Sequence, residues 1–248
     1  MKTKLFLLIL ALLSLNTSCL IVDMNDEFDD CDESIEGSGF LQTEIRALPD
    51  FNSVDMTTAG KVFVSSGAEQ QVSITVDDNL IEFITTTVRN GKLFIGTKPG
   101  VSLSNMNLTV NLIMTDLNEL ATSSAGSIVG RNKFAAESVR LILSSAGNIR
   151  LELEADRIYS NLSSAGNLYL SGNVREHNAI VSSAGNLYAF DLTTETTKIT
   201  LSSAGNAEVY VTQLLEATLS SIGSLFYKGY PTIYKNLSSK GKVIDKNP

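Results

Sequence analysis

The chain is expected to be an all-β protein that ends in a β-solenoid, and three observations predict this. A short phrase of the type SSAGN recurs with a nearly constant period of about 20 residues. On both sides of the phrase, apolar and polar residues alternate, which is typical of strands. Aromatic residues make up only 7% of the chain and Trp is absent, so small and β-branched side chains carry the apolar content. Stacked short strands suit this composition better than a bulky globular core.

The repeated phrase occupies most of the C-terminal half. SSAGS spans 123–127, and SSAGN spans 144–148, 163–167, 182–186 and 202–206. SSIGS and SSKGK follow at 220–224 and 238–242, and an earlier TTAGK at 57–61 has the same form. The period is too short for a propeller blade, and the pattern of leucine-rich repeats is missing. A parallel β-helix-like coil of about 20 residues is therefore predicted, with its corners at Gly126, Gly147, Gly166, Gly185, Gly205, Gly223 and Gly241.

Each residue of the phrase has an expected structural role. The glycines are expected to adopt positive φ angles at the corners, and the alanines before them are expected to point into the narrow coil. The asparagine side chains should stack on successive coils and hydrogen-bond along the stack. This predicts an asparagine ladder formed by Asn148, Asn167, Asn186 and Asn206.

Residues 40–118 show strand patterns without a strict period. A hairpin is predicted around Asn90-Gly91, because this dipeptide favours a tight two-residue turn. No Pro- or Gly-rich linker separates this half from the repeats. We therefore expect 40–248 to be one continuous unit, in which an irregular all-β half at 40–118 caps the solenoid at 119–248.

The N-terminus has the features of an export signal. Residues 1–18 combine Lys2 and Lys4 with an apolar run that is too short to span a bilayer comfortably. Small residues then precede Cys19, so a lipoprotein signal peptide and lipidation of Cys19 are predicted; a plain secretory signal is the alternative. The protein would then be anchored to a membrane through its lipid.

The segment after Cys19 is strongly acidic. Residues 19–39 are expected to form an extended tether, because dense like charges repel one another. Such stretches resemble the surface-export signal of lipoproteins in Bacteroidetes-type bacteria, although a solvated leader without a receptor is equally compatible. The expected location is the cell envelope, as an outer-membrane lipoprotein exposed at the surface. The leaflet and the role of Cys31 stay open.

Composition excludes several classes of function. The net charge of −8 disfavours nucleic-acid binding, because phosphates repel an acidic surface. Two Cys and the single His177 do not form a metal-ligand pattern or a hydrolytic triad. Neither a metal nor another cofactor is expected.

Several motifs together resemble the putative auto-transporter adhesin family with a head GIN domain. They are the SSAGN series, Phe51-Asn-Ser-Val54, Thr58-Ala-Gly60-Lys-Val-Phe-Val64, Asp78-Asn-Leu80 and Gly91-Lys-Leu93-Phe-Ile95. The resemblance covers roughly residues 44–242. It implies a right-handed β-helix-like fold on a secreted or lipid-anchored protein, and it supplies no catalytic or binding residues.

The expected function is that of a non-enzymatic surface adhesin or ligand-binding module. Tyr159, Tyr169, Tyr188 and Tyr210 recur near corresponding points of successive coils and could stack on sugar rings, so a carbohydrate or an extracellular protein is the expected ligand. These tyrosines could also simply cover the outer surface. A polysaccharide-active enzyme and a non-catalytic envelope scaffold are the alternatives, and a homodimer through the solenoid ends stays open. For the enzyme, charged candidates are Glu154, Asp156, Arg175 and Glu176.

Overall fold

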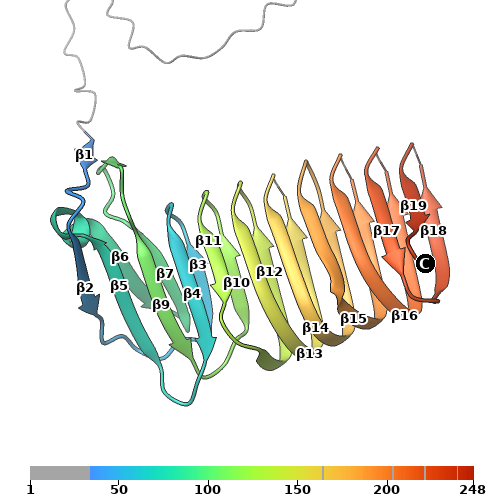
Figure 1. Cartoon of the computed structure of the whole chain (residues 1–248), viewed down its shortest axis with the longest axis horizontal. Coiled ribbons are helices and arrows are strands. Elements are labelled where there is room, and N and C mark those ends of the chain that lie inside the picture. Colours follow the sequence, from blue (N-terminus) through green and yellow to red (C-terminus); the bar gives the residue numbers. More distant parts are fainter. Residues whose placement is uncertain (1–33, 164, 203, 221, 239) are drawn as a thin grey trace, which may run out of the picture. The chain divides into compact units, whose positions relative to one another are not determined.

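Strands dominate the computed structural model, which describes residues 34–248 with the exception of 164, 203, 221 and 239 (Figure 1). Within the described residues, strands account for 65% and helix for 3%. A β-solenoid of about 6 turns, with about 19 residues per turn, follows an irregular N-terminal sheet, so the predicted fold class is confirmed. The predicted signal peptide, Cys19, Cys31 and most of the predicted acidic tether lie outside the described residues.

The repeats form a stack of parallel strands. The strands are β10 (Glu119–Thr122), β11 (Ser127–Gly130), β12 (Phe134–Leu143), β13 (Asn148–Leu162), β14 (Asn167–Val181), β15 (Asn186–Leu201), β16 (Asn206–Leu219), β17 (Ser224–Lys228), β18 (Thr232–Leu237) and β19 (Lys242–Asp245). Every pairing among them is parallel. We call each turn of the solenoid a rung. Corresponding residues of successive repeats therefore lie side by side on adjacent rungs.

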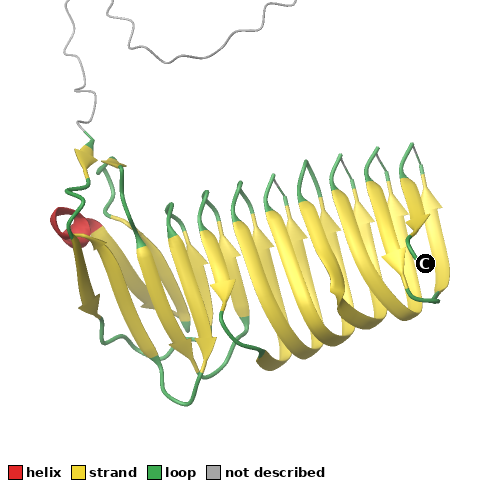
Figure 2. Cartoon of the chain, in the orientation of Figure 1, coloured by secondary structure: helices red, strands yellow, loops and turns green. Residues whose placement is uncertain are grey.

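Two edges of the stack differ in construction (Figure 2). Along one edge lie the tight turns made by the repeated phrase, and along the other the long strands β13–β16 bend without interruption. We call the strand segments that follow each turn sheet A and those that precede each turn sheet B. The first half of each long strand belongs to sheet A and its second half to sheet B.

The parallel stack begins earlier in the chain than the predicted boundary at residue 119. β3 (Ser53–Met56) pairs with β10, and β4 (Lys61–Ser66) pairs with β11, both in parallel. The TTAGK phrase at 57–61 joins them, and Ser127 N donates to Gly60 O across a distance of 3.0 Å. β7 (Lys92–Thr97) and β9 (Thr109–Met114) flank β3 and β4 on the other side. The rung of β3 and β4 therefore lies between the rung of β10 and β11 and the strands β7 and β9, all of which follow it in sequence. The period of the repeated phrase does not reveal this order.

Antiparallel strands close the N-terminal end. β2 (Leu41–Ile45) pairs with β5 (Gln71–Asp77) and β5 with β9 in sheet A, while β6 (Ile84–Arg89) pairs with β7 in sheet B. The short 3-10 helix η1 (Asp78–Phe83) links the two sheets, and β1 (Ile35–Glu36) forms a separate parallel pair with β8 (Leu103–Ser104). The β6–β7 hairpin turns at Asn90 (φ 50°) and Gly91 (φ 72°), as predicted.

Alternating side chains fill the space between sheets A and B. In β13, Ile149, Leu151 and Leu153 point inward from sheet A, and Ile158 and Leu162 point inward from sheet B; all five are buried. The same columns continue through the neighbouring rungs. The solenoid is therefore held by a continuous apolar core with small branched side chains, as the low aromatic content predicted.

At the turns, the expected roles of Gly and Ala are wrong. The alanines before the glycines are exposed, whereas the glycines themselves are buried. Gly126, Gly147, Gly166 and Gly205 do not have positive φ angles. A Cβ atom on Gly166 would lie 2.6 Å from the carbonyl oxygen of Gly147 in the preceding rung. Glycine is required here because successive turns stack too closely for a side chain, and not because of backbone conformation.

The last rung carries a lysine in the core-facing column. Lys235 in β18 is in register with Ala217, which in turn is in register with Ile199. Both of these residues are buried, but Lys235 is exposed, because no further rung covers it. An inward-facing charge on a terminal strand disfavours the addition of another strand. The tail also covers part of this rung, since the Asn247 side chain bonds both the N–H (2.9 Å) and the C=O (2.8 Å) of Gly229.

Candidate ligand-binding surface

The four asparagines of the repeated phrase stand in one column. The amide nitrogen Nδ2 of Asn167 donates to Oδ1 of Asn148 (2.9 Å), Asn186 donates to Asn167 (3.1 Å), and Asn206 donates to Asn186 (3.4 Å). Each interior member both donates and accepts within the column. The amides therefore bond to one another along the turn edge, which accounts for asparagine at this position without a ligand.

The four tyrosines do not form one row, and this expectation is wrong. Tyr169 and Tyr188 are in register on sheet A. Tyr159 lies on sheet B, where its partner in the next rung is Asn178. Extra residues in β15 shift the register between β15 and β16, so that Tyr210 pairs with Thr193 instead of Tyr188. Neither the strand bend nor this bulge could be located from the distance to the repeated glycine.

Neighbouring side chains cover the Tyr169 ring on sheet A. The Tyr169 and Tyr188 rings stack with their centroids 4.7 Å apart and an interplanar angle of 10°. The guanidinium of Arg150 lies 4.4 Å from the centroid of Tyr169. Both faces of Tyr169 are thus engaged within the protein, which leaves them unavailable to a sugar ring.

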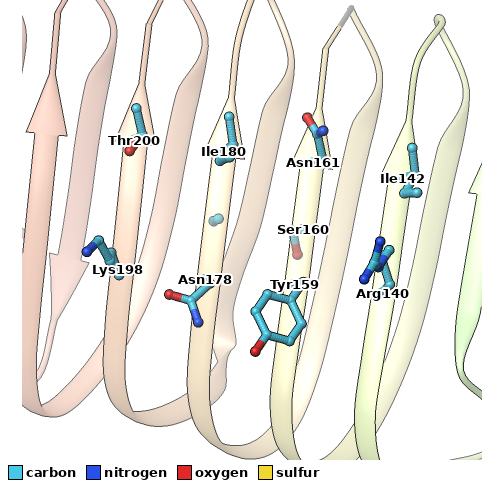
Figure 3. A pocket seen from close by; sticks show the side chains of 10 residues that line it. Arg140, Ile142, Tyr159, Ser160, Asn161, Asn178, Ile180, Lys198 and Thr200 are labelled. Atoms are coloured by element: carbon cyan, nitrogen blue, oxygen red, sulfur yellow. The ribbon is translucent and has the colours of Figure 1, made fainter.

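Sheet B carries a groove of about 410 Å³ on its outer face (Figure 3). The groove crosses four adjacent rungs, from β12 to β15. Its volume lies within the range of known small-ligand sites, roughly 300–1,000 Å³. Its lining residues are Arg140, Ile142, Tyr159, Ser160, Asn161, Asn178, Ala179, Ile180, Lys198 and Thr200.

The outward side chains of the groove form two rows across the strands (Figure 3). The first row contains Arg140, Tyr159, Asn178 and Lys198, and the second contains Ile142, Asn161, Ile180 and Thr200. The first row stands four residues before the first Ser of each phrase and the second row two residues before it. This constant offset is the signal by which sequence reasoning could have found the groove, had it considered positions before the phrase.

Tyr159 is the accessible aromatic residue of the groove. Its side chain is 40% exposed, and Ile180 beside it is 51% exposed. Among the described residues, no ring stacking or cation–π contact involves Tyr159. The Arg157 guanidinium interacts with the Tyr159 hydroxyl, which raises the pKa of Arg157. The groove therefore combines an uncovered ring, an apolar side chain and side-chain amides.

A second hollow, of about 570 Å³, lies on sheet A near residues 63–71. Its aromatic residue is Phe63, but Arg131 covers that ring at 4.2 Å from the centroid. Although this hollow is larger, it lacks an accessible aromatic face. The sheet B groove is consequently the stronger candidate for a ligand site.

His177 lies inside the solenoid beneath the groove and takes no part in its surface. The imidazole is fully buried, and Nε2 lies 2.9 Å from Oγ of Ser160, where either group can donate the hydrogen. Nδ1 has no hydrogen-bond partner among the described residues. Burial lowers the pKa of His177 to about 4, because the charged ring would lose its hydration.

The charged residues considered for catalysis are engaged in separate pairs. Glu154 lies 2.6 Å from Nζ of Lys133, and Asp156 lies 3.7 Å from the Arg175 guanidinium. Glu176 accepts a hydrogen bond of 2.8 Å from Asn178. None of the three carboxylates belongs to the groove lining.

Two further observations concern only the part of the chain that the structure describes. In these residues, no cluster of three or more His, Cys, Asp or Glu side chains is placed to hold a metal ion. Likewise, no helix in this part is long and apolar enough to cross a membrane.

The stacked parallel rungs, with a groove open on one sheet, define the class of the protein as a β-solenoid module. The chain belongs to the family described as putative auto-transporter adhesin, head GIN domain, whose model matches residues 50–231. This match confirms the resemblance seen in the sequence. No curated protein matches the chain.

Solved structures share the fold over most of their length. A putative adhesin from Bacteroides fragilis has a TM-score of 0.78 and 22% identity, and the match covers 86% of this chain and 99% of that one. A putative lipid binding protein from Parabacteroides distasonis has a TM-score of 0.74 and 22% identity, with 87% and 100% covered. A putative adhesin from Parabacteroides merdae has a TM-score of 0.71 and 21% identity, with 86% and 99% covered. At these identities the likeness shows the fold alone.

Proposed function

We propose that the protein is a lipid-anchored surface adhesin that binds a carbohydrate in the sheet B groove, without catalysis. The family supports a role in adhesion. The observation that carries the proposal is the uncovered ring of Tyr159 in the same groove as the side-chain amides of Asn161 and Asn178. Aromatic faces pack against the C–H faces of sugar rings, and amide groups serve both as donors and acceptors for hydroxyl groups.

The groove has the composition that sugar recognition needs. The Tyr159 ring offers an apolar face, and Ile142 and Ile180 extend it in the next row. Asn161 and Asn178 supply amides within the same four rungs. Because the strands hold these side chains on a regular backbone, little ordering is required when a ligand binds.

Removal of the Tyr159 ring tests the carbohydrate site. Purified protein is screened on a glycan array, and hits are measured by calorimetry for the wild type and for Tyr159→Ala. We expect the variant to bind at least about tenfold more weakly, which corresponds to about 1.4 kcal/mol. Tyr234→Ala is a matched control, because Tyr234 belongs to the same column, is 64% exposed and lies outside the groove.

Two results would contradict the proposal. One is an absence of binding to any glycan, in which case capture by intact outer membranes would favour an envelope scaffold. The other is an equal loss of affinity in Tyr159→Ala and Tyr234→Ala, which would place the ligand elsewhere. Release of reducing sugar from a bound polysaccharide would favour the enzymatic alternative.

Lipid anchoring is tested separately from binding. Cells that express the protein are labelled with radioactive palmitate, and we expect Cys19→Ala to abolish labelling while Cys31→Ala retains it. Protease treatment of intact cells then reports surface exposure. Labelling that persists in Cys19→Ala would refute the proposed anchor.

A further inference from the structure

We infer that the sheet B groove selects an acidic oligosaccharide and holds it across the rungs, with anionic groups near Arg140 and Lys198. This inference rests on the proposed carbohydrate site and adds to it the charge and the direction of the ligand. Three features carry it: the charges of the lining, the spacing of the rungs and the exposure of the two cations.

The groove lining is positively charged within a protein whose net charge is −8. Two of the ten lining residues are cationic, and none is Asp or Glu. An acidic sugar would thus meet two cations and no carboxylate in the groove itself. A neutral sugar would use only the ring and the amides.

The two cations are accessible to a ligand. Arg140 is exposed, and within the described chain no carboxylate lies at ion-pair distance from it. Lys198 is 67% exposed in its side chain and lies 3.5 Å from Glu216, which is outside the groove. Exposed pairs of this kind contribute little free energy, so Lys198 can exchange Glu216 for an anionic ligand at small cost.

The spacing of the first row fits a chain of sugars. Arg140, Tyr159, Asn178 and Lys198 occupy successive rungs. Neighbouring strands are about 4.8 Å apart, so three steps separate the two cations by roughly 14 Å. The spacing between adjacent rungs is close to the length of one pyranose unit in an extended glycan. A short oligosaccharide that runs perpendicular to the strands would therefore place one ring over Tyr159 and acidic groups at both ends.

The amide of Asn178 is oriented by its surroundings. Its Nδ2 donates to Glu176 Oε1 at 2.8 Å, which leaves the amide oxygen to accept hydrogen bonds from sugar hydroxyls. The row thus alternates a cation, a ring face, an acceptor and a second cation.

Paired probes with and without charge test the inference on the whole protein. One pair is hexagalacturonate and its methyl ester, and the other is a chondroitin sulfate hexasaccharide and its desulfated, carboxyl-reduced form. Binding is measured by calorimetry at low and at physiological salt. We expect at least one acidic probe to bind about tenfold more tightly than its neutral partner, and its affinity to fall as salt is added.

Charge-removing variants locate the effect. Arg140→Gln and Lys198→Gln should each weaken the acidic probe by about fivefold to tenfold and leave a neutral glycan unaffected, as expected when one charge-assisted hydrogen bond is lost. Arg89→Gln is the matched control, because Arg89 is exposed on β6, away from the groove. Circular dichroism is used to check that each variant is folded.

The outcomes separate this inference from the proposed function. If neutral glycans bind through Tyr159 but acidic probes bind no better, the carbohydrate site stands and the acidic selectivity is refuted. If acidic probes bind but Arg89→Gln weakens them as much as Arg140→Gln, the assigned cations are refuted. If no glycan of either kind binds, both the site and its selectivity are refuted.

Discussion

Between pH 6.5 and about 4, His177 alone should lower the free energy of unfolding of this protein by about 3 kcal/mol. Burial lowers the pKa of His177 from its ordinary value of 6.5 to about 4. In this window the unfolded chain binds a proton that the folded protein does not, so stability is lost as the pH falls. Each pKa unit corresponds to about 1.4 kcal/mol, which gives the magnitude. The contribution of His177 becomes constant only well above pH 6.5 and well below pH 4, where both states bind the same number of protons.

A double variant isolates this effect from other titrations. Ser160→Ala with His177→Leu replaces the buried polar pair by residue types that neighbouring rungs already carry in these columns, such as Ala179 and Leu215. Urea unfolding is followed at several pH values between 4 and 7.5 for both proteins. We expect the difference in unfolding free energy between them to change by about 3 kcal/mol across the window.

Other groups titrate alike in both proteins and cancel in the difference, including Asp55, whose carboxyl pKa is raised by burial. Hydrogen bonds from the backbone N–H groups of Asn107 and Gly39 lower the pKa of Asp77 below 3.8, so its stabilising contribution is present above pH 3.8 and is lost only as the pH falls further. Parallel stability curves for the wild type and the double variant would refute the reasoning. They would mean that the His177 imidazole is hydrated or gains a proton without cost.

Three further changes test the turns, the asparagine column and the covered tyrosine. Gly166→Ala should lower the free energy of unfolding by roughly 1–3 kcal/mol or more, because its Cβ would meet the Gly147 carbonyl; an unchanged denaturation midpoint would refute close stacking. Asn167→Ala should lower the free energy of unfolding by about 1–2 kcal/mol, because two side-chain hydrogen bonds are lost. A change of less than about 0.3 kcal/mol, which is roughly the error of such measurements, would show that water replaces these hydrogen bonds. Tyr169→Ala should cost about 1–2 kcal/mol in thermal or urea unfolding but leave glycan affinity unchanged; loss of affinity without loss of stability would return the ligand to sheet A.

Controls for these changes come from exposed positions of the same repeats. Ala165→Ser, beside Gly166, should be nearly neutral, because Ala165 points to solvent. Tyr159→Ala should cost less than Tyr169→Ala, because Tyr159 has a contact with Arg157 through its hydroxyl but no ring stacking or cation–π contact in the described protein. A large destabilisation by either control would show that the whole surface, and not the specific contact, is sensitive.

The sequence predicted the rungs because the repeat specifies their spacing directly. Alternating apolar residues around each glycine correctly indicated strands, and Asn148, Asn167, Asn186 and Asn206 stand at one offset from it. The inward and outward sense of the turn residues was not predictable in the same way. A glycine can serve either positive φ or close stacking, and only the position of the neighbouring turn distinguishes the two.

The groove and the rung formed by β3 and β4 were not predicted, for a different physical reason. β3 and β4 enter the stack out of chain order, and no local pattern encodes which strands become neighbours. Tyr159 and Tyr169 lie on opposite sides of the repeated phrase at 163–167, so their different sheets follow once this phrase is known to join sheet B to sheet A. The register shift in β15, which separates Tyr210 from the column of Tyr169 and Tyr188, has no such mark in the sequence.

The bulge in β15 has a consequence for how the gene could change length. β13 and β14 pair without a register shift, so duplication or loss of one 19-residue unit there would preserve every column of side chains. At β15 the offset between partners changes, and a unit copied across this point would bring mismatched residues together. Variation in repeat number is therefore compatible with the fold between β13 and β14 and disfavoured across β15.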